Sequence, residues 1–281
     1  MARIVAGVGS SHVPSFGPAY DAKKFDEPDW KPLFDGYTPV KRWLREVVKP
    51  DVAIVVYNDH GSDFSLDRVP TFAIGVREEY DQADEGLGTR PLPRVKGDAA
   101  LSWHIAQEVI YDEFDLTVCQ EMKVDHGLMA PLPLLFSHDP DWDVRVVPVV
   151  VNVIQHPLPT ALRCFRLGQS IARAVNSYSK DIRVAVIGTG GMSHQLHGER
   201  FGHLAQGFDR QWLDRIENDP EALCKLSHTE IMAIAGAEAV ELIMWLVMRG
   251  ALTGRIERQH TNYYAPMTTG MGLISLAADQ G

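Results

Sequence analysis

The chain has 281 residues, of which 45% are hydrophobic and 23% charged, and its formal net charge is −10. Its lysines and arginines are scattered, so the sequence lacks the concentrated basic surface that a nucleic-acid-binding protein needs. It has no run of about 18 apolar residues, which argues against a transmembrane helix. The first residues lead directly into a strand-like run and lack the apolar core and cleavage site of a signal peptide. We therefore expect a cytoplasmic protein with one domain over residues 1–281 and no membrane or nucleic-acid partner.

Apolar runs of strand length alternate with helix-like segments along the chain. The predicted strands span 3–8, 51–57, 70–76, 115–119, 144–153 and 182–187. The predicted helices span 39–49, 98–112, 158–177, 207–217, 220–226 and 228–249. This alternation predicts an α/β fold in which a mostly parallel central sheet has helices on both faces. Two long polar segments, 14–38 and 77–97, are predicted to be loops, and loops of such length are often functional.

Histidines follow three of the predicted strands. His12, His60 and His194 each lie in a stretch rich in glycine, serine or asparagine, directly after an apolar run. One such histidine is more often a loop residue, but the carboxyl ends of parallel strands meet at one edge of a sheet. His12 and His60 are therefore candidate metal ligands, since neutral imidazole is the commonest metal ligand. The neighbouring Asn58 and Asp59 are expected to orient the His60 ring.

A metal site with two imidazoles needs a further ligand, and Glu241 is the best candidate for it. Glu241 lies in the most apolar helical stretch of the chain, where a carboxylate is costly to bury unless it is paired or bound to metal. Glu230, Glu238 and Arg249 fall on the same side of a helical wheel, so a solvated stripe is the alternative interpretation. Two histidines and one carboxylate are the ligand set of non-haem Fe(II) oxygenases, and zinc hydrolases use the same ligand types.

Two further histidines have different settings. His194 follows the glycine-rich turn Gly188–Gly191, which lacks the Gly-Lys-Ser/Thr ending of a phosphate-binding loop. With His12 and His60 assigned to a metal, His194 is a candidate general acid or base. His126 follows no clean strand, and its residue context alone favours a structural role. The same holds for the remaining histidines and for the three cysteines, Cys119, Cys164 and Cys224.

These motifs together carry a family resemblance. The segments are Ser10–Pro14 (SSHVP), Val56–His60 (VYNDH), Val124–Gly127 (VDHG), Gly188–Gln195 (GTGGMSHQ) and Val240–Leu246 (VELIMWL). In this order and spacing, from Ala2 to about Gly272, the chain resembles the class III extradiol ring-cleavage dioxygenases. The resemblance is greatest to the catalytic (beta) subunits of protocatechuate 4,5-dioxygenases and to gallate and 3-O-methylgallate dioxygenases.

The resemblance implies a function and roles for the site residues. Fe(II) would be held by His12, His60 and Glu241, His194 would be the acid/base histidine, and His126 would be a second active-site histidine near the substrate. The reaction would be an oxidoreductase reaction that incorporates both atoms of O2. It would open a catecholic ring next to, not between, the two hydroxyl-bearing carbons.

Two departures from the family pattern bear on substrate and partners. Thr268 and Thr269 stand where the protocatechuate enzymes carry Ser-Asn to hold the substrate carboxylate, so a gallate-type ring with a third oxygen substituent is expected. Gallate dioxygenases continue into a helical domain that corresponds to a small alpha subunit, whereas this sequence stops at Gly281. The resemblance therefore implies either a small alpha-type subunit or a homodimer, beside a catecholic acid and O2 as small-molecule partners.

Two rival interpretations remain open at the level of the sequence. A zinc-dependent hydrolase on the same scaffold would use the same ligand types. A non-catalytic binding protein could retain the fold and lose the chemistry. Such a loss is expected to show as a missing ligand, and all the expected histidines and the glutamate are present.

Overall fold

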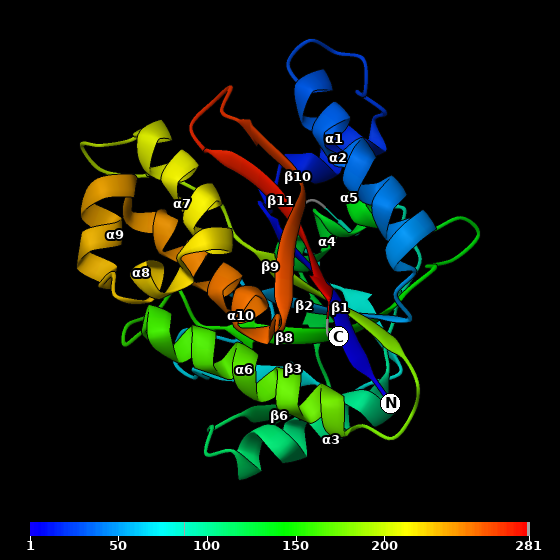
Figure 1. Ribbon diagram of the computed structural model, residues 1–281. Helices are drawn as coiled ribbons and strands as arrows, with labels where there is room; N and C mark the ends of the chain where they lie inside the picture. Colours follow the sequence, from blue (N-terminus) through cyan, green and yellow to red (C-terminus); the bar gives the residue numbers. More distant parts are fainter. Residues whose placement is uncertain (87, 280–281) are drawn as a thin grey trace.

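A large mixed sheet with a parallel centre runs through the computed structural model, which describes residues 1–86 and 88–279 (Figure 1). Its eight strands are ordered β10-β11-β1-β9-β2-β8-β3-β6. They are β1 (Arg3–Ser10), β2 (Val52–Tyr57), β3 (Phe72–Gly75), β6 (Thr117–Cys119), β8 (Arg145–Val151), β9 (Arg183–Thr189), β10 (Arg255–Tyr264) and β11 (Met271–Asp279). β1, β9, β2 and β8 pair in parallel, whereas β11 pairs antiparallel with β1 and β3 antiparallel with β8. The predicted α/β class with a mostly parallel central sheet is confirmed.

Helices cover both faces of this sheet. On one face lie α3 (Ala99–Tyr111), α6 (Ala161–Ser177) and α10 (Ile243–Ala251), and on the other α2 (Lys31–Trp43), α4 (His126–Met129) and α5 (Leu132–Leu135). The remaining helices are α1 (Phe16–Asp21), η1 (Leu44–Val48), α7 (Gln206–Asn218), α8 (Pro220–Cys224), α9 (His228–Ala235) and η2 (Ala237–Leu242). Because both faces are covered, the parallel strands are almost continuously apolar and buried.

Glycines allow α10 to lie directly on the sheet and on α6. A Cβ built on Gly9 of β1 would overlap the Trp245 ring, and one built on Gly188 of β9 would lie 2.8 Å from the Cα of Trp245. Where α6 crosses α10, a Cβ on Gly168 would overlap the Val247 carbonyl oxygen. The N-terminal end of α10 is thereby fixed at the edge where β1 and β9 end.

The predicted single helix over 228–249 is wrong, because the chain forms three segments there. α9 ends at Ala235, Gly236 adopts φ +103°, the 3-10 helix η2 follows, and α10 begins at Ile243. A side chain at Gly236 would overlap the His194 carbonyl oxygen, so glycine permits both the left-handed backbone and the close contact. Glu230 and Glu241 are therefore not on one helical wheel.

The sequence also left several elements unassigned. The hairpin of β10 and β11 falls in a C-terminal stretch with no predicted strand, and β10 is a half-exposed edge strand with little apolar signal. The predicted loop 14–38 contains α1 and the start of α2, which runs through Pro39. The predicted loop 77–97 contains β4 (Glu79–Gln82) and β5 (Val95–Lys96), which form a small sheet with β7 (Lys123–Val124).

In the part of the chain that the structure describes, no helix combines the length and apolar character needed to cross a membrane.

A pair of glycine substitutions tests the packing of α6 on α10. Gly168→Ala should lower the free energy of unfolding by about 1–3 kcal/mol, because the added methyl meets backbone and cannot be accommodated by rotation of a side chain. The control is Gly207→Ala in α7, where no atom lies within 4 Å of the new methyl. This change should raise the free energy of unfolding by up to about 1 kcal/mol, because alanine has the higher helix propensity. Denaturant unfolding measures both, and equal stabilisation by the two changes would contradict the packing argument.

Candidate active site

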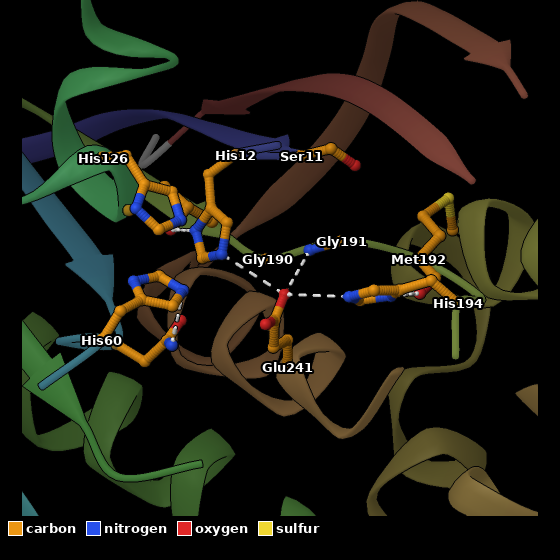
Figure 2. A network of polar contacts seen from close by, with 12 residues as sticks. Ser11, His12, His60, His126, Gly190, Gly191, Met192, His194 and Glu241 are labelled. Carbon is orange, nitrogen blue, oxygen red and sulfur yellow. Dashed lines mark hydrogen bonds and ion pairs between the residues drawn. The ribbon is translucent and has the colours of Figure 1, made fainter. Parts of the chain in front are cut away.

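The ends of β1, β2 and β9 bring His12, His60 and the turn Gly190–Gly191 to one edge of the sheet (Figure 2). The ring centroids of His12 and His60 are 5.2 Å apart. Glu241 reaches the same place from η2, and its carboxylate points toward His12. The structure thus brings together the three residues predicted as metal ligands, and their role as ligands stays a prediction.

The His12 side chain is only 3% exposed, and its two ring nitrogens have different surroundings. Nδ1 lies 2.8 Å from the Thr189 hydroxyl oxygen, at the end of β9. Nε2 is buried, has no hydrogen-bond partner among the described residues, and lies 3.3 Å from Oε2 of Glu241. A buried nitrogen without a partner beside a carboxylate fits a metal ligand, because a cation would satisfy both groups.

His60 is oriented by a buried carboxylate that the sequence did not single out. Oδ2 of Asp125 accepts from the His60 backbone N–H at 2.7 Å and lies 3.0 Å from its Nδ1. Burial alone would raise the pKa of Asp125, but the hydrogen bonds and charge of His60 outweigh burial and lower it. Asn58 contacts Nε2 of His60 as expected, whereas Asp59 instead accepts from backbone N–H groups of its own loop. The expected orienting role of Asp59 is therefore wrong.

His126 lies in the site, although its sequence context favoured a structural role. Its ring stacks on that of His60, with centroids 3.8 Å apart. Glu85, from the long predicted loop 77–97, lies 2.5 Å from Nδ1 of His126 and accepts from its backbone N–H at 2.9 Å. Nitrogen atoms of His12, His60 and His126 all lie within 4.8 Å of one another. Three imidazoles are therefore a rival ligand set to two imidazoles and Glu241.

The Glu241 side chain is 12% exposed and belongs to the site, not to a solvated stripe. Its Oε2 accepts from the Gly191 N–H at 2.7 Å and lies 4.0 Å from Nε2 of His194. Burial alone would raise the pKa of Glu241, but the facing imidazoles of His12, His194 and His60 outweigh burial and hold it well below its ordinary value. The carboxylate therefore stays ionised, and an ionised carboxylate with imidazole nitrogens is a suitable donor set for a divalent cation.

His194 is held by the backbone of its own turn and faces the other histidines. Nδ1 lies 2.7 Å from the Met192 carbonyl oxygen, which can only accept, so Nδ1 carries the proton and Nε2 faces Glu241. The backbone of His194 pairs with that of Thr269. Thr269 is buried and Thr268 half-buried, and neither hydroxyl has a hydrogen bond within the described residues.

A cavity of about 800 Å³ opens over this edge of the sheet. All the residues predicted to bind metal or substrate, or to transfer protons, line it: His12, His60, His126, His194, Glu241, Thr268 and Thr269. Its described lining contains no lysine or arginine, so a bound carboxylate would meet only imidazole N–H, hydroxyl and backbone donors from this chain. Much of the rest of the wall is apolar, including Val153, Leu158 and Met271, as is usual for a small-molecule site.

The chain thus has an α/β fold, and a cluster of imidazoles with one carboxylate forms a candidate mononuclear metal site at the carboxyl ends of its parallel strands. Residues 6–274 match the family described as the catalytic LigB subunit of aromatic ring-opening dioxygenase, and the chain belongs to this family. The resemblance carried by the sequence motifs is thereby confirmed.

Named relatives agree with this assignment. The chain is 45% identical over 194 residues to a gallate dioxygenase of Pseudomonas putida, a match that covers 69% of this chain and 57% of that relative. It therefore spans little more than half of that protein. It is 28% identical over 269 residues to a 2,3-dihydroxyphenylpropionate/2,3-dihydroxicinnamic acid 1,2-dioxygenase of Pseudomonas putida. This match covers 79% of this chain and 83% of that relative. A crystal structure of an uncharacterized protein from Escherichia coli K12 shares the fold, with a TM-score of 0.62 and 14% sequence identity. The superposition covers 98% of this chain and 100% of that one.

Metal content distinguishes the two ligand sets. If Glu241 is a ligand, Glu241→Ala should weaken metal binding on the order of 100-fold or more, since even partners of metal ligands contribute about 10–100-fold. His126→Ala should then keep its metal. Glu238→Ala is the matched control, because Glu238 lies in the same 3-10 helix but pairs with the exposed His197. Elemental analysis and competitive titration are the measurements, and loss of metal from His126→Ala but not from Glu241→Ala would establish the three-imidazole set.

Proposed function

We propose that this chain is a non-haem Fe(II)-dependent extradiol dioxygenase, which opens the ring of a carboxylated catechol of gallate type with O2. One observation carries the proposal. Two imidazoles and an ionised carboxylate converge in one cavity, beside a further imidazole whose Nδ1 is already engaged by backbone. Membership of the family of aromatic ring-opening dioxygenases supports it.

His12, His60 and Glu241 would hold the Fe(II) ion, because two histidines and one carboxylate with open positions are the ligand set of non-haem Fe(II) oxygenases. When bound, the ion supplies the redox chemistry that allows a ring diol to react with O2. Thr189 and Asp125 hold the His12 and His60 rings through Nδ1, so Nε2 is the nitrogen that each ring would offer to the metal. Nε2 of His12 has no hydrogen-bond partner among the described residues, whereas Nε2 of His60 would exchange its contact with Asn58 for the metal. The protein thereby fixes the ligands before the metal arrives.

His194 would move protons at Nε2. Its Nδ1–H donates to the Met192 carbonyl oxygen, so only Nε2 can take a proton from a ring hydroxyl and later return one as the ring opens. His126 lines the same cavity and would contact the substrate. Thr268 and Thr269 would donate to the substrate carboxylate, because their hydroxyls are unengaged and no lysine or arginine of the described chain lines the cavity.

A second chain would close the cavity. Ile154, Leu196 and Met267 line it and are 43%, 51% and 50% exposed, so large apolar side chains of the cavity wall face solvent. Ring opening in a closed site would require that this solvent be excluded. Either a small alpha-type subunit or a second copy of this chain would cover these side chains.

Oxygen uptake tests the proposed activity. Protein loaded with Fe(II) without air should consume one O2 per molecule of gallate or 3-O-methylgallate opened, and the product should form with loss of the aromatic absorbance. Zinc-loaded protein is the control and should consume none. Absence of uptake with all catecholic acids, together with ester or amide hydrolysis by the zinc form, would favour a zinc hydrolase.

Replacing the proton-transferring histidine should separate chemistry from binding. His194→Gln should keep its iron and its KM for the diol, while kcat falls about 10²–10⁴-fold, the usual contribution of a positioned acid or base. The control His104→Gln removes an imidazole that contacts the Ala174 carbonyl on α6, away from the cavity, and should leave kcat unchanged. Loss of iron from His194→Gln would place His194 among the metal ligands.

Exchange of the two threonines tests substrate choice. The double change Thr268→Ser with Thr269→Asn should shift relative kcat/KM from gallate toward protocatechuate by about 1–3 kcal/mol, because it adds an amide donor and removes two methyl groups from the wall. Steady-state kinetics on gallate, 3-O-methylgallate and protocatechuate measure this shift. Equal changes for all three substrates would show that these residues do not contact the ring substituents.

A further inference from the structure

A buried carboxylate lies behind the turn that carries His194 and does not line the cavity. Asp209 is in the first turn of α7 and is 0% exposed. Burying an ionised carboxylate is costly unless several donors satisfy it. The donors that satisfy Asp209 therefore identify the part of the fold that this residue holds in place.

Asp209 accepts three hydrogen bonds from two residues. Oδ1 accepts from the Ser193 backbone N–H at 2.9 Å, and Oδ2 accepts from the Ser193 hydroxyl at 2.5 Å. The Tyr263 hydroxyl, from β10, also donates to Oδ2 at 2.7 Å. The Ser193 hydroxyl in turn accepts from the Ala205 N–H at 2.8 Å. Both the backbone and the side chain of Ser193 are thereby fixed, one residue before His194.

The same carboxylate lies against the segment that carries the two threonines. The Met192 N–H donates to the Gly270 carbonyl at 3.0 Å, and the Gly270 N–H donates to the Ser193 carbonyl at 2.9 Å. A Cβ built on Gly270 would overlap Oδ2 of Asp209, so glycine is needed for the carboxylate to approach. Asp209 therefore bonds to Ser193 and lies against Gly270, where the two segments pair.

This arrangement bears on the direction of the His194 ring. The acceptor for Nδ1 of His194 is the carbonyl of Met192, so Ser193 separates the ring from the group that orients it. Any movement of Ser193 shifts the acceptor and the ring relative to each other.

We propose that Asp209 is a positioning residue for His194. Through Ser193, and with Tyr263 as the second donor residue, it holds the turn that directs Nε2 of His194 into the cavity. The inference rests on the proposed function of His194 in proton transfer. It adds a residue from α7 that touches neither the substrate nor the proposed metal ligands.

Asp209→Asn should lower kcat about 10–100-fold, because a displacement on the order of 1 Å at a reacting group can cost about 10²-fold. KM for the diol and the iron content should change less than about twofold, since neither depends on the His194 ring. Tyr263→Phe removes one of the three donors and should lower kcat about 2–10-fold. The matched control is Asp214→Asn, a carboxylate 66% exposed on the same helix, which should leave kcat unchanged.

A double-mutant cycle distinguishes positioning from general loss of stability. In the His194→Gln background, Asp209→Asn and Tyr263→Phe should each lower the residual rate less than about twofold, because the residue through which they act is absent. The same loss in both backgrounds would overturn the proposal. If Asp209→Asn does not fold, the comparison of Tyr263→Phe in the wild-type and His194→Gln backgrounds tests the proposal by itself.

A measurement without turnover separates this inference from the proposed function. The Nδ1–H proton of His194, assigned in NMR spectra by its loss in His194→Gln, should exchange with water at least about tenfold faster in Asp209→Asn than in Asp214→Asn. Unchanged exchange would overturn the positioning role even if the enzyme opens rings. Faster exchange in a protein that consumes no O2 would retain the positioning role and reject the proposed function.

Discussion

The packing of α10 directly on β1 and β9 is the constraint from which the site follows. Because Gly9 and Gly188 carry no side chain, Trp245 packs directly against the two strands, and the 3-10 helix before α10 is fixed at the strand ends. Glu241 then projects across those ends toward His12. A larger residue on either strand would lift the helix and withdraw the carboxylate that lies 3.3 Å from Nε2 of His12. The candidate metal site therefore depends on glycines that belong to the core and not to the cavity.

All four histidines of the site have Nδ1 beside an oxygen atom of the protein. The oxygens come from a hydroxyl, two carboxylates and a backbone carbonyl: Thr189 for His12, Asp125 for His60, Glu85 for His126 and Met192 for His194. With Nδ1 engaged, Nε2 is the nitrogen that each ring presents to the site, where Asn58 contacts that of His60 and Glu241 adds a negative charge. Convergent lone pairs and a carboxylate repel one another in the absence of a cation. A donor set of this kind suits a divalent cation, which is the basis of the proposed metal site.

The sequence predicted the fold class, and it predicted which histidines meet at one edge of the sheet, because both follow from simple periodicity. Buried runs alternating with helices predict a parallel sheet, and histidines after those runs must meet at its carboxyl edge. The sequence did not predict the break at Gly236, since a glycine within an apolar helical pattern looks tolerable until the His194 carbonyl oxygen packs against it. β10 was missed because an edge strand with half-exposed residues lacks the apolar signal of a central one. β11 is buried between β10 and β1 and does carry that signal, so its omission has no such reason.

The residues that the sequence could not reveal share one property, which is that each acts through a partner distant in the chain. Asp125, Glu85 and Asp209 are ordinary acidic residues in their local context, and none lies in an apolar run that would mark it as unusual. Their effect arises only when the fold places them on the far side of a histidine ring or of its turn. The position of a histidine after a strand thus predicts where its ring lies. The oxygen behind the ring decides which nitrogen is free, and so whether that histidine can bind a metal or transfer a proton.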